Sequence, residues 1–263
     1  MDKLEKENSQ ELDFDPVIVI ASLGVPAHSL DAMLKRVYTS TWDDIKVVLA
    51  MHEILDPDNV NDAINLAAQH TELGHNVEVI SVNRHSFAYA YLKGIQHASD
   101  QGNVVVEMDS GGGHLPEEIP SFLAALKSNE IALSSRFIRG ATNAYPFGRR
   151  ITSMAVTQMS NLFLGTNLTD AASGFEAFHS EVLNILFTDY PPEEWISALD
   201  GPFHMYQTEL RAALTNVAKQ YNYNIVEVPI TYGAEKQGQN LPFSYLLQAL
   251  ICFAKIWLNK DKS

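Results

Sequence analysis

The stretch VVVEMDSGGGHLPEE, residues 104–118, contains the feature that decides the fold of this chain. Its first five residues form a short, mostly apolar and β-branched run, as in a strand buried on both faces of a sheet. Asp109 ends the run, and three glycines and His114 follow it. Ligands of open α/β sheets bind at the carboxyl ends of strands, so this stretch predicts a ligand-facing acid at a strand end.

Similar short apolar runs recur along the first half of the chain. The other predicted strands are Val17–Ala21, Lys46–Ala50, Val77–Val82 and Ile131–Ser134. Helical patterns fill the intervals at residues 56–74, 85–98 and 115–129, and Asp58 or Asn59 is the predicted cap of the first. Strands that alternate with helices predict βαβ units and a mainly parallel sheet through about residue 135.

The regular alternation of predicted strands and helices ends after residue 140. The predicted elements are a long helix over Phe147–Leu164, a short apolar segment over Gly174–Phe178, a helix around Gln207–Lys219 and a strand over Ile225–Ile230. No internal repeat or linker separates them from the first half. We therefore expect a flexible tail over residues 1–15 and a single domain over residues 16–263.

Composition narrows the class of protein. The 263 residues are 46% hydrophobic and carry a net charge of −14, which opposes non-specific binding to nucleic acid, although a local basic patch keeps that partner open. Cys252 is the single cysteine, which predicts a reducing compartment, and the charged N-terminus lacks the apolar core of a signal peptide. We expect a cytoplasmic protein whose apolar segment at residues 244–260 packs on the domain or lies at an interface, including a membrane surface.

Two segments have residues suited to chemistry on phosphates. The backbone of Gly111, Gly112 and Gly113 can approach a ligand closely, so the Asp109 loop suits a phosphorylated ligand or its metal. The alternative for Asp109 is an ordinary turn that it caps. The nine histidines do not have the spacing of a structural metal site.

The second segment concentrates positive charge. Arg136, Arg139, Arg149 and Arg150 lie within fifteen residues, and Ser153 follows one helical turn after Arg149. Guanidinium groups make paired contacts with phosphate oxygens, so this cluster predicts a phosphate site. The alternative is a set of salt bridges to the abundant carboxylates.

Several motifs together resemble family 2 glycosyltransferases of the GT-A fold. They are the 104–126 run, SSRF with the following GRR, TDAASGF, YQTEL and IVEVPITY. The resemblance covers residues 15–255. Within the family, the chain is most similar to the dolichol-phosphate mannosyltransferase and polyprenyl-phosphate glycosyltransferase branch. It implies a Rossmann-like, mainly parallel α/β sheet flanked by helices, with a C-terminal elaboration, and a nucleotide-sugar donor.

The resemblance also implies roles for single residues. DSGGGHLP matches a D-A-D-x-S/Q-H-P-P motif that holds Mg²⁺ or Mn²⁺ on the donor diphosphate; it keeps Asp109 and His114 but has Gly111 in place of the second acid. The implied phosphate contacts, at the matched positions of the arginine segments and of EKQGQN, are Arg136, Arg149, Arg150, Ser153 and Lys236.

The donor half departs from the family pattern. Val25 stands where the family has a nucleotide-contacting glutamate, and the paired aspartates expected after the second strand are absent from VLAMHEILDPD. Glu53, Asp56 or Asp58 could substitute for them from shifted positions. The resemblance therefore implies a rebuilt donor pocket beside a retained phosphate-facing half.

Three functions remain open at this point. The first is an inverting transferase whose acceptor is a polyprenyl phosphate, which needs no strong general base because its oxygen is already anionic. The second uses a hydroxyl acceptor, on a sugar, protein, lipid or modified nucleobase, and would need Asp170, Glu209 or His114 as base. The third is a non-catalytic binding or regulatory module.

Overall fold

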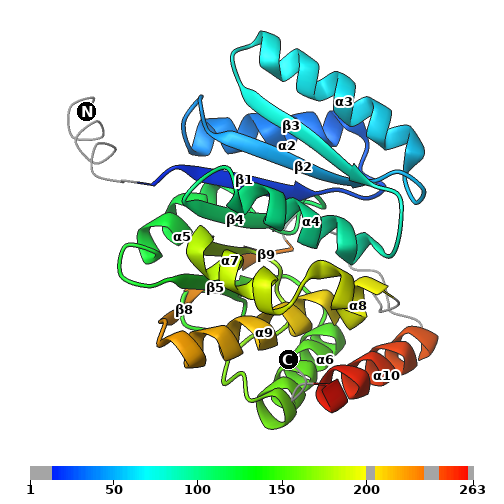
Figure 1. The fold of residues 1–263 in the computed structure, drawn as a ribbon, viewed down its shortest axis with the longest axis vertical. Coiled ribbons are helices and arrows are strands. Elements are labelled where there is room, and N and C mark those ends of the chain that lie inside the picture. Colours follow the sequence, from blue (N-terminus) through cyan, green and yellow to red (C-terminus); the bar gives the residue numbers. More distant parts are fainter. Residues whose placement is uncertain (1–13, 200–204, 234–242, 260–263) are drawn as a thin grey trace.

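A seven-stranded sheet forms the centre of the molecule (Figure 1). The computed structural model describes residues 14–199, 205–233 and 243–259. The strand order is β3-β2-β1-β4-β7-β5-β8. The strands are β1 (Pro16–Ala21), β2 (Lys46–His52), β3 (Asn76–Val82), β4 (Val104–Asp109), β5 (Ile131–Ser135), β7 (Glu176–His179) and β8 (Ile225–Pro229).

The prediction of a mainly parallel sheet is confirmed. β1 pairs in parallel with both β2 and β4, and β5 pairs in parallel with β8. Only β7 among these strands runs antiparallel, between β4 and β5. β7 is the short apolar segment predicted at residues 174–178, and its insertion joins the two halves of the chain in one sheet.

Helices cover both faces of the sheet. One apolar core lies under α2 (Ala27–Ser40), α3 (Pro57–Glu72) and α5 (Ile119–Ala125), the last preceded by the 3₁₀ turn η1 (Pro116–Glu118). The other lies under α4 (Phe87–Ser99), α7 (Ser180–Asp189), α8 (Ile196–Leu199) and α9 (Met205–Tyr221), with the turn η3 (Pro192–Glu194). The inner strands β1, β2, β4 and β5 are buried along almost their whole length, which explains why their sequences are nearly continuous apolar runs. The edge strands β3 and β8 are mostly half-buried.

Three details differ from the sequence predictions. Helix α2 had no predicted counterpart. The residue that caps α3 is Asp56, not Asp58 or Asn59, because the helix begins at Pro57. The folded body also includes Phe14 and Asp15 of the predicted tail, since Phe14 packs edge-on against His179 and the Asp15 amide donates to the Asn103 side chain.

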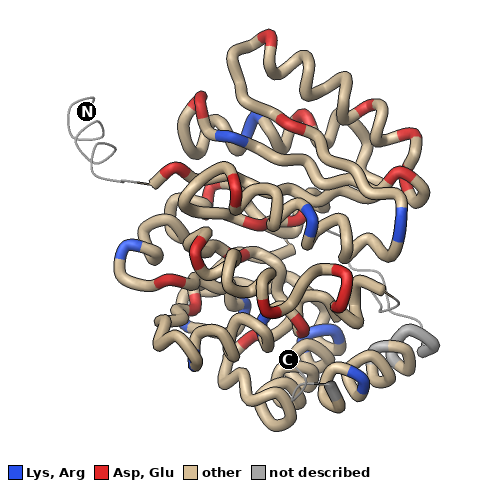
Figure 2. The backbone as a smooth tube through the Cα atoms, viewed as in Figure 1, with Lys and Arg blue, Asp and Glu red and all other residues tan. Residues whose placement is uncertain are grey.

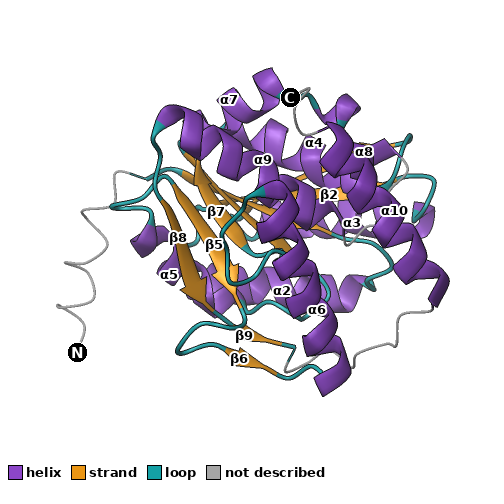
Figure 3. Cartoon of the chain, turned by 90° about the horizontal axis from the view of Figure 1, so that it is seen from below, coloured by secondary structure: helices purple, strands orange, loops and turns teal. Residues whose placement is uncertain are grey.

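The remaining elements lie at the carboxyl edge and below the second half of the sheet. Helix α6 (Phe147–Met159) continues into a π turn, η2 (Ser160–Leu164), and ends at Gly165 in the left-handed conformation, as predicted. Strands β6 (Thr142–Asn143) and β9 (Thr231–Tyr232) form a small parallel pair beside the start of α6 (Figure 3). Helix α10 (Phe243–Asn259) packs Cys252, Phe253 and Ile256 against α9 and η2.

Close packing of α4 on the sheet depends on Gly94. A Cβ there would lie 2.8 Å from Ala50 Cβ and 3.0 Å from a methyl of Val19. We expect Gly94→Ala to lower the free energy of unfolding by about 1–3 kcal/mol, because the steric clash outweighs alanine's helix propensity. Chemical denaturation measures this. Gly148→Ala in α6 is the control, since nothing lies within 4 Å of its added Cβ, and equal effects of the two variants would contradict the packing argument.

Candidate functional site

Asp109 lies at the carboxyl edge of the sheet, as predicted. It is the last residue of β4 and pairs in register with Ala21 at the end of β1. Its side chain is 24% exposed, and its buried Oδ1 atom has no hydrogen-bond partner among the residues that the structure describes. The strand order changes direction between β1 and β4, which is where ligands of open α/β sheets bind.

The glycine loop after Asp109 is shaped partly by the protein itself. Gly112 adopts the left-handed conformation with a φ of 71°, which glycine reaches without strain. At Gly113, however, an added Cβ would lie 2.9 Å from the ring of Tyr232. Tyr232 therefore occupies the space that a side chain at position 113 would need, and the contact of Gly113 with a ligand stays a prediction. Gly111 and Gly112 are half-buried and remain candidates for ligand contact.

His114 is packed into the protein at the base of this loop. Its Nδ1 atom accepts a hydrogen bond from the Asp109 backbone amide at 3.3 Å and lies 3.5 Å from Asp109 Oδ1. Its ring is 1% exposed and contacts the rings of Phe175 and Tyr232. His114 therefore positions the loop, and its role as a metal ligand stays a prediction that this geometry does not favour.

Arg136 and Asp170 form a buried ion pair. Arg136 Nε donates to Asp170 Oδ2 at 2.7 Å and its terminal nitrogen donates to Oδ1 at 2.8 Å. Burial opposes ionisation of Asp170, but Arg136 outweighs burial and holds the pKa of Asp170 below its usual range. Both carboxylate oxygens are engaged with Arg136. The predicted phosphate contact of Arg136 and the predicted catalytic role of Asp170 stay predictions, and the contacts favour a role in fixing the loop.

Two tyrosines connect the arginines to the glycine loop. Tyr145 donates its hydroxyl to that of Tyr232 at 2.8 Å. The guanidinium of Arg149 lies 3.9 Å from the ring centre of Tyr145, and that of Arg136 lies 5.2 Å from the ring centre of Tyr232. Tyr232 in turn rests on Gly113. The fold thus brings Asp109, Arg136 and Arg149 into one connected cluster.

The other predicted phosphate contacts lie on or beyond α6. Arg150 is exposed in the first turn of α6, and Ser153 is half-buried one turn after Arg149. Lys236 lies outside the described residues. α6 therefore presents two of the predicted basic residues next to the tyrosine pair.

Glu209 belongs to a different part of the structure. Its two carboxylate oxygens accept hydrogen bonds from the backbone amides of Ile196 and Ser197, at 3.0 and 2.8 Å. Burial raises the pKa of Glu209. These contacts tie α9 to α8, and the catalytic role of Glu209 stays a prediction without geometric support.

A buried polar network beneath the site was missed at the sequence level. Arg211, fully buried on α9, donates to Glu176 Oε1 at 2.6 Å, to the Ser134 carbonyl at 2.9 Å and to the Asp170 carbonyl. It therefore joins β7, β5 and the Asp170 loop. The signals in the sequence were a glutamate inside each of two apolar strands, at positions 107 and 176.

Glu107 and Glu176 face each other across β4 and β7. They are register partners, and neither is exposed. Burial raises the pKa of Glu107 well above its usual range, and the neighbouring Glu176 raises it further. Glu107 Oε1 accepts hydrogen bonds from Tyr206 and Gln207, while Oε2 has no acceptor or donor partner among the described residues. Burial and the neighbouring Glu176 thus both favour the protonated form of Glu107.

Asp109 is the one carboxylate of this cluster that could bind a divalent cation. No group of three His, Cys, Asp or Glu side chains in the described part of the chain could hold a metal. The unpartnered Oδ1 of Asp109 fits an ion that takes its other ligands from water and a diphosphate, as Mg²⁺ commonly does. It does not fit an ion enclosed by protein ligands.

Glu53, Asp56 and Asp58, the acids that could replace the missing aspartates of the donor half, differ in exposure and in hydrogen bonding. Asp56 accepts hydrogen bonds from the Gly24 amide and the Asn59 side chain, both at 2.6 Å, and so ties the β1 loop to α3. Glu53 is exposed and accepts a hydrogen bond from Ser81. Asp58 is exposed. Glu53 and Asp58 therefore remain accessible at the edge, whereas Asp56 has a structural role.

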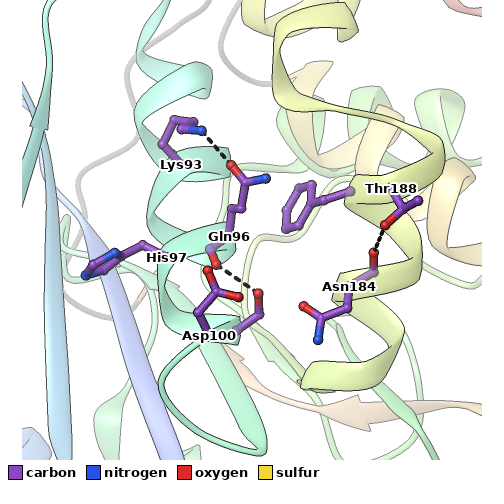
Figure 4. Close-up of a pocket in the computed structure, with 8 residues that line it drawn as sticks. Lys93, Gln96, His97, Asp100, Asn184 and Thr188 are labelled. Atoms are coloured by element: carbon purple, nitrogen blue, oxygen red, sulfur yellow. Dashed lines mark hydrogen bonds between the residues drawn. The ribbon is translucent and has the colours of Figure 1, made fainter.

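A surface hollow of about 470 Å³ lies between α4 and α7 (Figure 4). Lys93, Gln96, His97 and Asn184 are among its lining residues. Lys93 donates to Gln96, and Thr188 donates to the Asn184 carbonyl. The hollow lies along the last turns of α4, toward the amino ends of the parallel strands. It contains none of the predicted site residues.

The family model described as glycosyl transferase family 2 matches residues 17–187, which include the Asp109 loop, Arg136, Arg149 and Asp170. The chain belongs to glycosyl transferase family 2. This family 2 chain is 29% identical over 153 residues to an undecaprenyl-phosphate mannosyltransferase of Micrococcus luteus, covering 57% of this chain and 58% of the relative. It is 31% identical over 153 residues to a polyprenol monophosphomannose synthase of Mycolicibacterium smegmatis, covering 57% and 53%. The chain therefore spans little more than half the length of these curated relatives.

Solved structures agree on the fold of this family 2 protein. A glucosyl-3-phosphoglycerate synthase from Mycobacterium tuberculosis, solved with Mn²⁺, UDP and glucosyl-3-phosphoglycerate, superposes with a TM-score of 0.57. The sequence identity is 15%, and the match covers 94% of this chain and 80% of that one. The GT-A fold implied by the motifs is confirmed.

Removal of Arg211 should be severe for stability. We expect Arg211→Met to cost about 3–5 kcal/mol, because it leaves Glu176 and two carbonyls buried without their donor. Chemical denaturation measures the loss. Arg150→Met is the matched control, since Arg150 is exposed, and should change stability by less than about 0.5 kcal/mol. A mild effect at Arg211 would contradict the network.

The raised pKa of Glu107 has a testable consequence for how stability depends on pH. A raised pKa means that the folded protein binds the proton more tightly than the unfolded chain, so wild-type stability falls as pH rises above the ordinary carboxyl pKa. Glu107→Gln mimics the neutral acid and lacks this loss. We expect its stability relative to wild type to increase from pH 5 to pH 8, by up to about 1.4 kcal/mol per pH unit. Urea denaturation at several pH values measures the difference, and a constant difference would contradict a raised pKa of Glu107.

Proposed function

We propose that this protein transfers a sugar from a nucleotide-sugar donor to a polyprenyl phosphate. The family assignment and the names of the two relatives support the reaction class and the acceptor. The observation that carries the choice of acceptor is the state of the candidate bases. Asp170 is held by Arg136, and both oxygens of Glu209 accept backbone hydrogen bonds.

A phosphate acceptor is compatible with such a site. Its oxygen is anionic at neutral pH and can attack the anomeric carbon without transferring a proton to a base. A hydroxyl acceptor would require a base at the reacting atom, and neither carboxylate is available for that. This favours the polyprenyl phosphate over a hydroxyl acceptor.

The chemistry is a single displacement. A phosphate oxygen of the acceptor forms a bond to the anomeric carbon, the bond from that carbon to the donor diphosphate breaks, and the configuration inverts. Arg149, Arg150 and Ser153 would orient the acceptor phosphate, while Asp109 would face the donor diphosphate. A Mg²⁺ or Mn²⁺ ion bound at Asp109 would offset charge on the departing diphosphate. Arg136, paired with Asp170, would hold the end of β5 in place beneath these residues.

Donor binding is the first test of this proposal. A nucleoside diphosphate present at about 100 times its Kd should stabilise the fold by about 2.7 kcal/mol, so a thermal-shift panel of nucleotides with Mg²⁺, Mn²⁺ or EDTA would detect it. We expect one nucleotide to give a metal-dependent shift that Asp109→Asn removes. Asp44→Asn, in the exposed loop before β2, is the control and should keep the shift. A panel without any shift would instead support the non-catalytic module.

Acceptor specificity is tested with the same protein. With the identified donor, a short-chain polyprenyl phosphate should be glycosylated and the corresponding polyprenol should not. Arg149→Gln should raise the KM for the polyprenyl phosphate by about tenfold or more, because one charged contact is lost, with a smaller effect on the donor KM. Transfer to the polyprenol at a similar rate would contradict the phosphate acceptor.

A further inference from the structure

Helix α10 exposes an almost wholly apolar face. Cys252, Phe253 and Ile256 point into the protein and are buried. On the opposite side, the exposed apolar residues of the helix are Leu247, Leu250, Ile251, Trp257 and Leu258, which range from 41% to 68% exposed. Because a soluble surface helix normally carries polar side chains on its outer face, this stripe marks an interaction surface.

Helix α6 carries a second stripe of the same kind. Phe147, Ile151 and Met154 recur at helical spacing and are 77%, 50% and 52% exposed. At its end, the ring of Phe163 contacts Phe253 and Trp257 of α10, with centroids 6.1 and 5.7 Å apart. Figures 1 and 3 both show α6 and α10 side by side, and in Figure 1 they lie below the sheet. We call the exposed residues of these two helices the α6–α10 surface.

The charge of this surface is opposite to that of the whole protein. The chain carries −14 overall, yet no Asp or Glu occurs from residue 131 to residue 169 or within α10. The exposed charged residues on the two helices are Arg150 and Lys255, and no acidic segment lies on either helix in Figure 2. Apolar side chains flanked by basic ones, in an acidic protein, complement an anionic lipid headgroup layer.

We propose that the α6–α10 surface docks onto the face of an anionic lipid bilayer, with its apolar side chains in the interfacial layer and its basic side chains at the headgroups. Among the described residues, no helix has the length and hydropathy needed to span a membrane. Docking through α6 would bring Arg149, Arg150 and Ser153 to the headgroup layer, where the phosphate of a lipid acceptor lies. That consequence rests on the proposed function, whereas the docking itself does not.

Charge argues against a second copy of the chain as the occupant. A two-fold interface brings the same patch of both subunits together, so it would enclose Arg150 and Lys255 of both copies. Neither α6 nor α10 contains an Asp or Glu that could offset the cost of desolvating these charges. A bilayer with anionic headgroups supplies the opposite charge instead.

Vesicle flotation tests the proposal without nucleotide, sugar or polyprenyl phosphate, so its outcome is separate from that of the transfer assays. The probes are vesicles of phosphatidylcholine with and without phosphatidylglycerol. We expect the full chain to float with the anionic vesicles and to dissociate as salt is raised. Brominated lipids should quench the fluorescence of the exposed Trp257 in the unmodified protein, which reports insertion without any substitution.

Three substitutions with similar starting exposure locate the surface. Ile251→Glu on α10 and Met154→Glu on α6 should each weaken the vesicle partition coefficient by about tenfold, because each removes an apolar side chain from the interface. Ile64→Glu on α3, where the side chain is also 50% exposed, should stay within about twofold of wild type. Far-ultraviolet circular dichroism checks that each variant is folded.

Several outcomes would overturn the proposal. No flotation with anionic vesicles, or equal binding to neutral ones, would exclude the anionic bilayer. Wild-type binding by Met154→Glu would exclude α6 from the surface. A lipid-free dimer in sedimentation that Ile251→Glu converts to a monomer would assign the surface to a second copy of the chain.

Discussion

The two buried ion pairs at the centre of the sheet fix the geometry on which the rest of the site depends. Arg136 with Asp170 and Arg211 with Glu176 bring charge into a region without solvent, where only close pairing and further hydrogen bonds offset the cost of desolvation. Arg211 also donates to the carbonyls of Ser134 and Asp170. The end of β5 and the loop before β7 are therefore locked to α9, and this support lies directly beneath the phosphate-facing residues.

The site has two layers with different physical character. The lower layer is buried and paired, and Glu107, whose pKa burial raises, accepts hydrogen bonds from Tyr206 and Gln207 within it. The upper layer consists of Asp109, the glycine loop and the first turns of α6, which reach solvent. Tyr145 and Tyr232 connect the layers, because their rings contact Arg149 above and Arg136 below. Such a supporting layer holds the groups above it in a fixed geometry.

The donor half lacks acids that the family motifs predict, whereas the half with the arginine cluster keeps its predicted residues. Asp56 closes the β1 loop on α3, so the acid nearest to the missing family aspartates is used in structure. Under the proposed function, a nucleotide there would contact backbone groups and accessible residues such as Glu53. The acceptor phosphate would instead meet the arginines that the family motifs predict.

The sequence by itself determined the strands of the parallel half, the position of Asp109 at a strand end and the helix that ends at Gly165, because apolar periodicity and glycine stops are local signals. It also identified the family through short motifs. Only the tertiary structure decided which of the predicted residues act together. Arg136 meets Asp170 34 positions away, and Tyr232 takes the space at Gly113, because β7 enters the sheet antiparallel and β9 pairs with β6. Contacts of this kind depend on how distant strands pair, and no local pattern encodes that pairing.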